Sequence, residues 1–136
     1  MILVDTSIWI ELLNGRLGDR VSKDDLQRFV TCAPVLQELF QGLRDGPATD
    51  VLRDSLLALR RVHDPLPLST YLEAAEIYRQ VRRRGNTVRS SNDCLIAAIA
   101  IANKLPLWHR DRDYETIAKF TNLETVQFAP EAAGHP

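Results

Sequence analysis

The chain has 136 residues with 17 basic and 18 acidic side chains, so its formal net charge of −1 excludes an overall basic field that would indicate nucleic-acid binding. Hydrophobic residues make up 45% and charged residues 26%, which is typical of a globular protein rather than a disordered one. No apolar run reaches the roughly 18 residues that a membrane span needs. No basic segment precedes the first apolar run, so a secretory signal is not expected either.

The two cysteines, Cys32 and Cys94, lie far apart in apolar surroundings and have no metal-ligand neighbours. We therefore expect buried thiols in a reducing cytoplasm. The length and the lack of an internal repeat predict a single domain over residues 1–130. A flexible tail is expected at 131–136.

Short strands alternate with helices in the first half of the chain. The apolar run at 2–4 is typical of a strand that is buried on both faces of a parallel sheet. Ser22 is a favourable N-cap for a polar helix. The remaining elements predicted here are a helix at 8–13, a strand at 29–33, a helix from Pro34 to Leu43 and a helix at 48–59.

The same alternation continues in the second half. Thr70 and Glu73 have the spacing of a capping box for a helix that runs to Arg84. Ser90 or Ser91 caps the next helix, which is apolar all round and should therefore be central. The other predicted elements are strands at 61–63, 107–109 and 125–128 and a small helix around 117–120. This order predicts a three-layer α/β/α sandwich around a short, mostly parallel sheet.

Four carboxylates, Asp5, Glu38, Asp93 and Asp111, lie next to or inside strongly apolar segments. Each has a structural alternative. Asp5 could cap the helix that follows it, Glu38 could face solvent, and Asp93 suits the positive end of its helix. Asp113 is a natural N-cap for a helix starting at the next residue, and Asp111 could do the same. Because ligands of α/β sheets bind beyond the carboxyl ends of strands, these positions can also converge in one crevice.

Convergent carboxylates need a cation, because like charges repel and raise each other's pKa. An all-oxygen group suits Mg²⁺ or Mn²⁺ rather than zinc, and the three histidines lack zinc-site spacing. Such an ion can activate a water and orient a phosphodiester. Thr6, Ser7 and Asn92 could hold metal-bound waters, or they could orient the carboxylates through hydrogen bonds. The pattern fits a nuclease, and it also fits other acidic metal sites of α/β proteins.

Five arginines fall in one segment that contains no acidic residue. They could simply favour the last turn of a helix that Gly85 closes. They could equally bind RNA phosphates. The segment contains Arg79, Arg82, Arg83, Arg84 and Arg89, of which the last four are the candidate RNA contacts.

Four segments together resemble the PIN-domain ribonucleases, and more narrowly the VapC toxins of bacterial toxin–antitoxin pairs. The resemblance extends from Met1 to about Phe128. The segments are Asp5-Thr6-Ser7-Ile8-Trp9, Glu38-Leu39, Asn92 to Ala98, and His109 to Tyr114.

The resemblance implies an acidic site of Asp5, Glu38, Asp93 and Asp111 that binds one or two Mg²⁺ or Mn²⁺ ions and cleaves RNA, often tRNA or ribosomal RNA. Asp113 resembles a second acid of the last motif, and we expect it to lie in an outer shell or to cap the helix. The resemblance also implies a cognate VapB-type antitoxin that blocks the acidic cleft. A homodimer is implied as well.

Two further expectations concern His109 and the dimer. His109 stands where the family often has a small polar residue. We expect it to end the strand, although it could influence metal-bound water. Exposed apolar side chains on the helices of residues 48–81 could supply dimer contacts, or they could belong to the core.

Three other interpretations are weaker. A phosphate-signalling receiver needs an acidic doublet after the first strand and a lysine after the last, whereas Thr6 and Ser7 follow Asp5 and no lysine follows residue 128. An aspartate-nucleophile phosphatase needs a second aspartate at the position of Ser7. An inactive PIN scaffold that only binds RNA or protein is opposed by the intact acids, although fold and function can separate.

Overall fold

The computed structural model describes residues 1–17 and 20–126. The predicted tail at 131–136 and the end of the predicted last strand lie outside the described residues. The elements, in chain order, are β1 (Ile2–Val4), α1 (Thr6–Leu13), α2 (Lys23–Gln27), β2 (Phe29–Val30), α3 (Ala33–Gln41), α4 (Pro47–Leu57), α5 (Leu68–Arg83), α6 (Ser91–Ala102), β3 (Leu107–Trp108), α7 (Arg112–Phe120) and β4 (Thr125–Val126).

The sheet has four short strands in the order β2-β1-β3-β4, and every neighbouring pair is parallel. Leu3 lies at its centre, opposite Val30 on one side and Leu107 on the other. This confirms the predicted parallel sheet. Because parallel strands all end at the same edge, the residues that follow β1 and β3 are brought close together.

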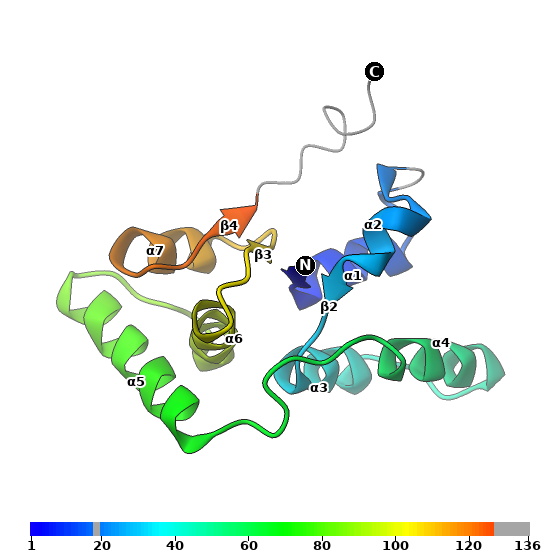
Figure 1. Ribbon diagram of the computed structural model, residues 1–136, viewed down its shortest axis with the longest axis horizontal. Helices are drawn as coiled ribbons and strands as arrows, with labels where there is room; N and C mark the ends of the chain where they lie inside the picture. The colour runs from blue at the N-terminus through cyan, green and yellow to red at the C-terminus, as the bar shows by residue number, and fades with distance from the viewer. Residues whose placement is uncertain (18–19, 127–136) are drawn as a thin grey trace.

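Helices cover the sheet and complete a three-layer α/β/α sandwich (Figure 1). The predicted central helix is α6, where residues 96–100 are all buried. Helix α5 packs along α6, and α7 contacts both of them, while α1 packs on α3. Within residues 1–17 and 20–126, no helix has the length and apolar character needed to cross a membrane.

Aromatic packing fixes the strands to the helices. The Phe29 ring lies between two tryptophans, with its centroid 6.0 Å from Trp9 and 5.5 Å from Trp108. All three side chains are buried, and Leu3 and Val4 of β1 are fully buried beside them. Burial of such large apolar surfaces is the main term that holds two-residue strands in place.

Helix starts were predicted with mixed success. The Ser22 cap is confirmed, because its hydroxyl accepts from the Asp25 N–H and the Asp25 carboxylate accepts from the Ser22 N–H. The Thr70 capping box is wrong: α5 starts at Leu68, three residues earlier, with Pro67 as its N-cap. Thr70 is buried in the first turn instead, and its hydroxyl lies 2.6 Å from Nε2 of His63.

Three predicted strands are shorter than expected, and the one at 107–109 ends at Trp108. The strand at 29–33 stops at Val30, because α3 already begins at Ala33. The strand at 61–63 is reduced to a single parallel bridge between Thr31 and Arg61. The central strand and the buried helix, which position the acids, lie where the sequence placed them.

Candidate active site

The carboxyl edge of the sheet gathers the predicted acids from four elements. Asp5 directly follows β1, and Asp111 follows β3 after a two-residue turn. Asp93 lies in the first turn of α6, and Glu38 lies in α3. Hydrogen bonds across gaps of more than fifty residues join Asp5 to Tyr114 and Glu38 to Asn92, so the fold brings segments that are distant in sequence together at this edge.

Asp5 is a buried carboxylate, 4% exposed, that is also the N-cap of α1. Its Oδ2 accepts from the Ser7 N–H at 3.1 Å and from the Ser7 hydroxyl at 2.6 Å. The Ser7 Oγ in turn accepts from the Arg110 N–H at 3.1 Å. Asp5 therefore does cap α1, which was the structural alternative for this residue. Capping uses only one of the two carboxylate oxygens and leaves Oδ1 directed elsewhere.

The second oxygen of Asp5 meets Tyr114, a residue that was not among the predicted site residues. The Tyr114 hydroxyl lies 2.8 Å from Asp5 Oδ1 and 3.2 Å from Asp93 Oδ1. Burial, reinforced by these two carboxylates, raises the pKa of Tyr114 well above its ordinary value, so the hydroxyl keeps its proton. The sequence did carry a signal: Tyr114 shares a helical face with Ile117 and Ala118, and a buried tyrosine needs a polar partner.

Glu38 does not simply face solvent. Its Oε1 accepts from the Thr6 hydroxyl at 3.1 Å and from the Asn92 side-chain amide at 2.8 Å. These two donors come from α1 and α6, so Glu38 connects the helix after the first strand to the helix that carries Asp93. Thr6 and Asn92 thus both donate to one carboxylate, and their role in orienting it stays a prediction.

Asp93 has the most strongly perturbed carboxyl group of the site. Burial, together with the charges of Asp111 and Asp5, raises its pKa to about 7 despite the Tyr114 hydrogen bond, which lowers it. The Asp93 residue is 6% exposed. Its carboxylate oxygens can approach those of Asp111 and Asp113 within 4.8 Å, a grouping that could hold a metal ion.

Asp111, rather than Asp113, caps the start of α7. The helix starts at Arg112, and its N-cap is Asp111, whose Oδ1 accepts from the Asp113 N–H at 2.9 Å. A cap at Asp113 is therefore wrong. Asp113 is buried in the first turn and belongs to the group with Asp93 and Asp111, which places it nearer the centre of the site than an outer shell.

Arg89 is the arginine that reaches the acids. Its backbone N–H donates to Asp113 Oδ2 at 3.0 Å, and its guanidinium lies 3.2 Å from Asp111 Oδ1 and 3.5 Å from Asp113 Oδ2. The Arg89 side chain remains 68% exposed, so it reaches from the carboxylates into solvent. This placement could hold a phosphate next to the acids.

The other three candidate RNA contacts lie at the end of α5 and have local partners. Arg83 pairs with Glu76 at 2.7 Å, while the guanidinium carbons of Arg82 and Arg84 lie over aromatic rings at 5.7 and 5.3 Å. The turn after them includes Gly85 with a positive φ of 79°, as expected for the end of a helix. The helix-end explanation therefore describes these three side chains well.

His109 supports the turn that carries Asp111. Its Nδ1 accepts from the Asp111 N–H at 3.1 Å, and its Nε2 lies 3.3 Å from Glu115. Its ring lies 4.9 Å from the Tyr114 ring. Burial lowers the pKa of His109, so the imidazole is neutral at pH 7. Strand β3 ends at Trp108, so His109 follows the strand rather than ending it.

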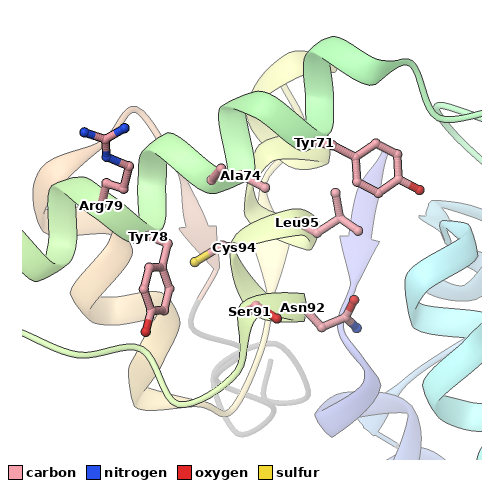
Figure 2. Close-up of a pocket in the computed structure, with 9 residues that line it drawn as sticks. Tyr71, Ala74, Tyr78, Arg79, Ser91, Asn92, Cys94 and Leu95 are labelled. Atoms are coloured by element: carbon pink, nitrogen blue, oxygen red, sulfur yellow. The ribbon is translucent and has the colours of Figure 1, made fainter.

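A surface groove of about 530 Å³ lies beside the acids, between α5 and α6 (Figure 2). Asn92 links the two features, since it lines the groove and also donates to Glu38. The groove is lined mainly by apolar atoms of α5 and α6. Its lining residues include Tyr71, Ala74, Tyr78, Cys94 and Leu95.

Comparison with known proteins agrees with this geometry. The PIN domain family matches residues 2–120. Ribonuclease VapC11 of Mycobacterium tuberculosis is 37% identical over 134 residues, covering 94% of this chain and 99% of that protein. Ribonuclease VapC5 of the same species is 30% identical over 129 residues, covering 92% of this chain and 93% of that protein.

A solved structure shares the fold at lower identity. The structure of VapBC-1 from nontypeable Haemophilus influenzae has a TM-score of 0.71 to this chain at 20% identity, covering 93% of this chain and 98% of that one. The family match extends over most of the chain, and the four acidic positions lie within it. The chain therefore belongs to the PIN-domain family and, within it, to the VapC ribonucleases.

Proposed function

We propose that this protein is a metal-dependent endoribonuclease toxin that hydrolyses RNA phosphodiester bonds in the cytoplasm and is neutralised by a VapB-type antitoxin. One observation carries the proposal. The buried carboxylates of Asp5 and Asp93 share the Tyr114 hydroxyl, and oxygens of Asp93, Asp111 and Asp113 lie within 4.8 Å of one another, in a chain 37% identical to Ribonuclease VapC11. The metal, the cleaved RNA class and the antitoxin are parts of this proposal.

The donor set fits Mg²⁺ or Mn²⁺. We assign the ion to Asp5, Glu38, Asp93 and Asp111, with Asp113 as an additional candidate ligand. Carboxylate oxygens are the ligands that these hard ions prefer. The raised pKa of Asp93 is consistent with this assignment, because burial and then the negative charges of Asp111 and Asp5 raise it. When bound, such an ion supplies a water nucleophile and stabilises the leaving oxygen of the phosphodiester.

The chain's own residues hold the carboxylates in place. Ser7 fixes one oxygen of Asp5 and Tyr114 fixes the other. Both hydrogen bonds to Glu38 end on Oε1, so neither Thr6 nor Asn92 engages its Oε2. Side chains held in this way lose little freedom on binding an ion, which favours a preorganised site.

RNA would approach the acids past the arginines. We assign Arg89 to a phosphate next to the scissile bond, because its exposed guanidinium already lies at the carboxylates. Arg82, Arg83 and Arg84 are also exposed, and we assign them to phosphates further along the RNA. A structured RNA such as a tRNA, whose loops expose unpaired bases, is the substrate class we propose.

We further propose a homodimer that uses the outer face of α5. Leu68 and Leu72 are 72% and 62% exposed there and lie one turn apart, so they form one apolar surface on the same face of the helix. Burying them against a second copy would remove this surface from water. This assignment is independent of the catalytic residues.

The deciding experiment is cleavage of purified small RNA by the isolated protein with Mg²⁺, with Mn²⁺ or with chelator. Discrete fragments that disappear with chelator and with the Asp5→Asn variant are the expected result. Sequencing the fragment ends would identify the cleaved RNA. Cleavage that persists in both conditions would contradict the metal-dependent mechanism. No cleavage by folded wild-type protein under either ion would favour an inactive RNA- or protein-binding scaffold.

A further inference from the structure

The Tyr114 hydroxyl lies between the two most buried carboxylates of the site. It is 2.8 Å from Asp5 Oδ1 and 3.2 Å from Asp93 Oδ1, and the Tyr114 residue is fully buried. The three residues come from three elements: the end of β1, the first turn of α6 and the first turn of α7. One oxygen atom thus connects the two carboxylates across the centre of the site.

Packing alone does not explain a tyrosine at this position. The ring fills the core next to His109, with centroids 4.9 Å apart, and a phenylalanine ring would fill the same space. The hydroxyl is what distinguishes tyrosine, and burying a hydroxyl is unfavourable unless it is hydrogen-bonded. Its partners here are two carboxylates of the proposed metal site, so the hydroxyl can influence how these carboxylates are oriented.

The hydroxyl completes the restraint on Asp5. Ser7 holds Oδ2 through its N–H and its hydroxyl, at 3.1 and 2.6 Å. Tyr114 holds Oδ1, so rotation of the carboxylate would break contacts at both oxygens. Without Tyr114, the Oδ1 atom and its counterpart on Asp93 would lose the donor that they share, and two like charges would repel directly.

We propose that Tyr114 is a positioning residue that holds Asp5 and Asp93 in the relative orientation that binds the divalent ion. Tyr114 acts through the two carboxylates and does not contact RNA or the attacking water. This role rests on the proposed metal site. It predicts that removing one oxygen atom weakens metal binding without changing the acidic residues themselves.

The first test compares Tyr114→Phe with wild type and with Tyr71→Phe, which removes a hydroxyl from the exposed groove. Mn²⁺ affinity, measured by electron paramagnetic resonance of free Mn²⁺, should fall roughly 10- to 100-fold in Tyr114→Phe, the range for lost partners of metal ligands. It should be unchanged in Tyr71→Phe. Saturating Mn²⁺ should restore much of the kcat of Tyr114→Phe, and its KM for RNA should stay near the wild-type value.

Two outcomes separate this proposal from the proposed function. Wild-type protein that binds no Mn²⁺ would overturn the metal site, and the role of Tyr114 with it. Wild-type and Tyr114→Phe proteins that bind Mn²⁺ within twofold of each other would overturn the role of Tyr114 alone.

A second measurement works even where Tyr114→Phe does not fold. The chain has three tyrosines, and the other two, Tyr71 and Tyr78, are exposed. The Tyr71→Phe/Tyr78→Phe protein therefore keeps Tyr114 as its one tyrosine, and ¹³Cζ-labelled tyrosine gives a single NMR signal. Adding Mg²⁺ should shift this signal, because the ion changes the charge of both hydrogen-bond partners. A signal that stays in place while Mg²⁺ binds would overturn the proposal.

Discussion

Ionised Asp93 should destabilise the metal-free protein, and Asp93→Asn should relieve this. Its pKa rises from 3.8 to about 7 through burial and the nearby charges of Asp111 and Asp5. At 1.36 kcal/mol per pKa unit, this difference corresponds to about 4 kcal/mol of unfolding free energy that is lost above pH 7. The sign follows from proton binding. Between these pKa values the folded state binds a proton that the unfolded state does not, so stability falls as the pH rises from about 4 to about 7.

Asparagine has nearly the same shape, and its side-chain oxygen can still accept from Tyr114. The unfolding free energy of Asp93→Asn relative to wild type should therefore grow by roughly 2 to 3 kcal/mol between pH 5 and pH 8. Urea denaturation of both proteins with chelator, at four pH values, measures this difference. Comparing the two proteins removes the contribution of groups such as His109 that titrate alike in both.

Two outcomes would bear on the reasoning. The reasoning predicts that ionisation of the buried Asp93 carboxyl destabilises the folded protein. It would be refuted if Asp93→Asn were no more stable than wild type at pH 8 in chelator. Saturating Mg²⁺ should remove the advantage of the variant, because an ion that binds the folded state selectively stabilises wild type. If the advantage persisted unchanged in Mg²⁺, the ion would not be using Asp93.

Two predictions concern residues around the acids. Arg89→Ala should raise the KM for RNA and lower the salt dependence of RNA binding by about one phosphate contact. It should also bind Mn²⁺ more tightly, because the Arg89 guanidinium no longer neutralises Asp111. Arg83→Ala is the matched control, and an equal gain in Mn²⁺ affinity there would contradict the special position of Arg89. Asn92→Ala removes the 2.8 Å hydrogen bond to Glu38 and should lower Mn²⁺ affinity roughly tenfold, as titration calorimetry would measure. Unchanged affinity would place Glu38 outside the metal site.

The parts of the site that the sequence predicted depend on local pattern. Asp5 follows an apolar run that is typical of a buried strand, and in α/β proteins ligands bind beyond the carboxyl ends of the parallel strands. The all-apolar stretch after Asp93 predicted a central helix, and a carboxylate in the first turn of such a helix is expected to be buried. In both cases a few consecutive residues carried the information.

The parts that the sequence did not predict depend on contacts between distant segments. The Tyr114 hydroxyl reaches residues 109 and 21 positions away, and no local pattern encodes those distances. Arg89 was expected either at a helix end or at RNA phosphates, and its approach to Asp111 was not predicted because it depends on where α7 begins. Thr70 has a capping spacing, but Pro67 starts the helix earlier and His63 takes the hydroxyl. Tertiary partners prevailed over local preference in each case.

The double use of Asp5, as the cap of α1 and as a site carboxylate, determines how an inactive form should be made. Toxicity to the host is a common obstacle in producing a toxin, and an inactive variant avoids it. Asparagine caps helices about as well as aspartate, so Asp5→Asn removes the charge and retains an acceptor for the Ser7 N–H. Alanine would remove both and weaken the start of the helix by about 1 kcal/mol. For crystallisation or antitoxin-free purification, asparagine is therefore the residue to place at position 5.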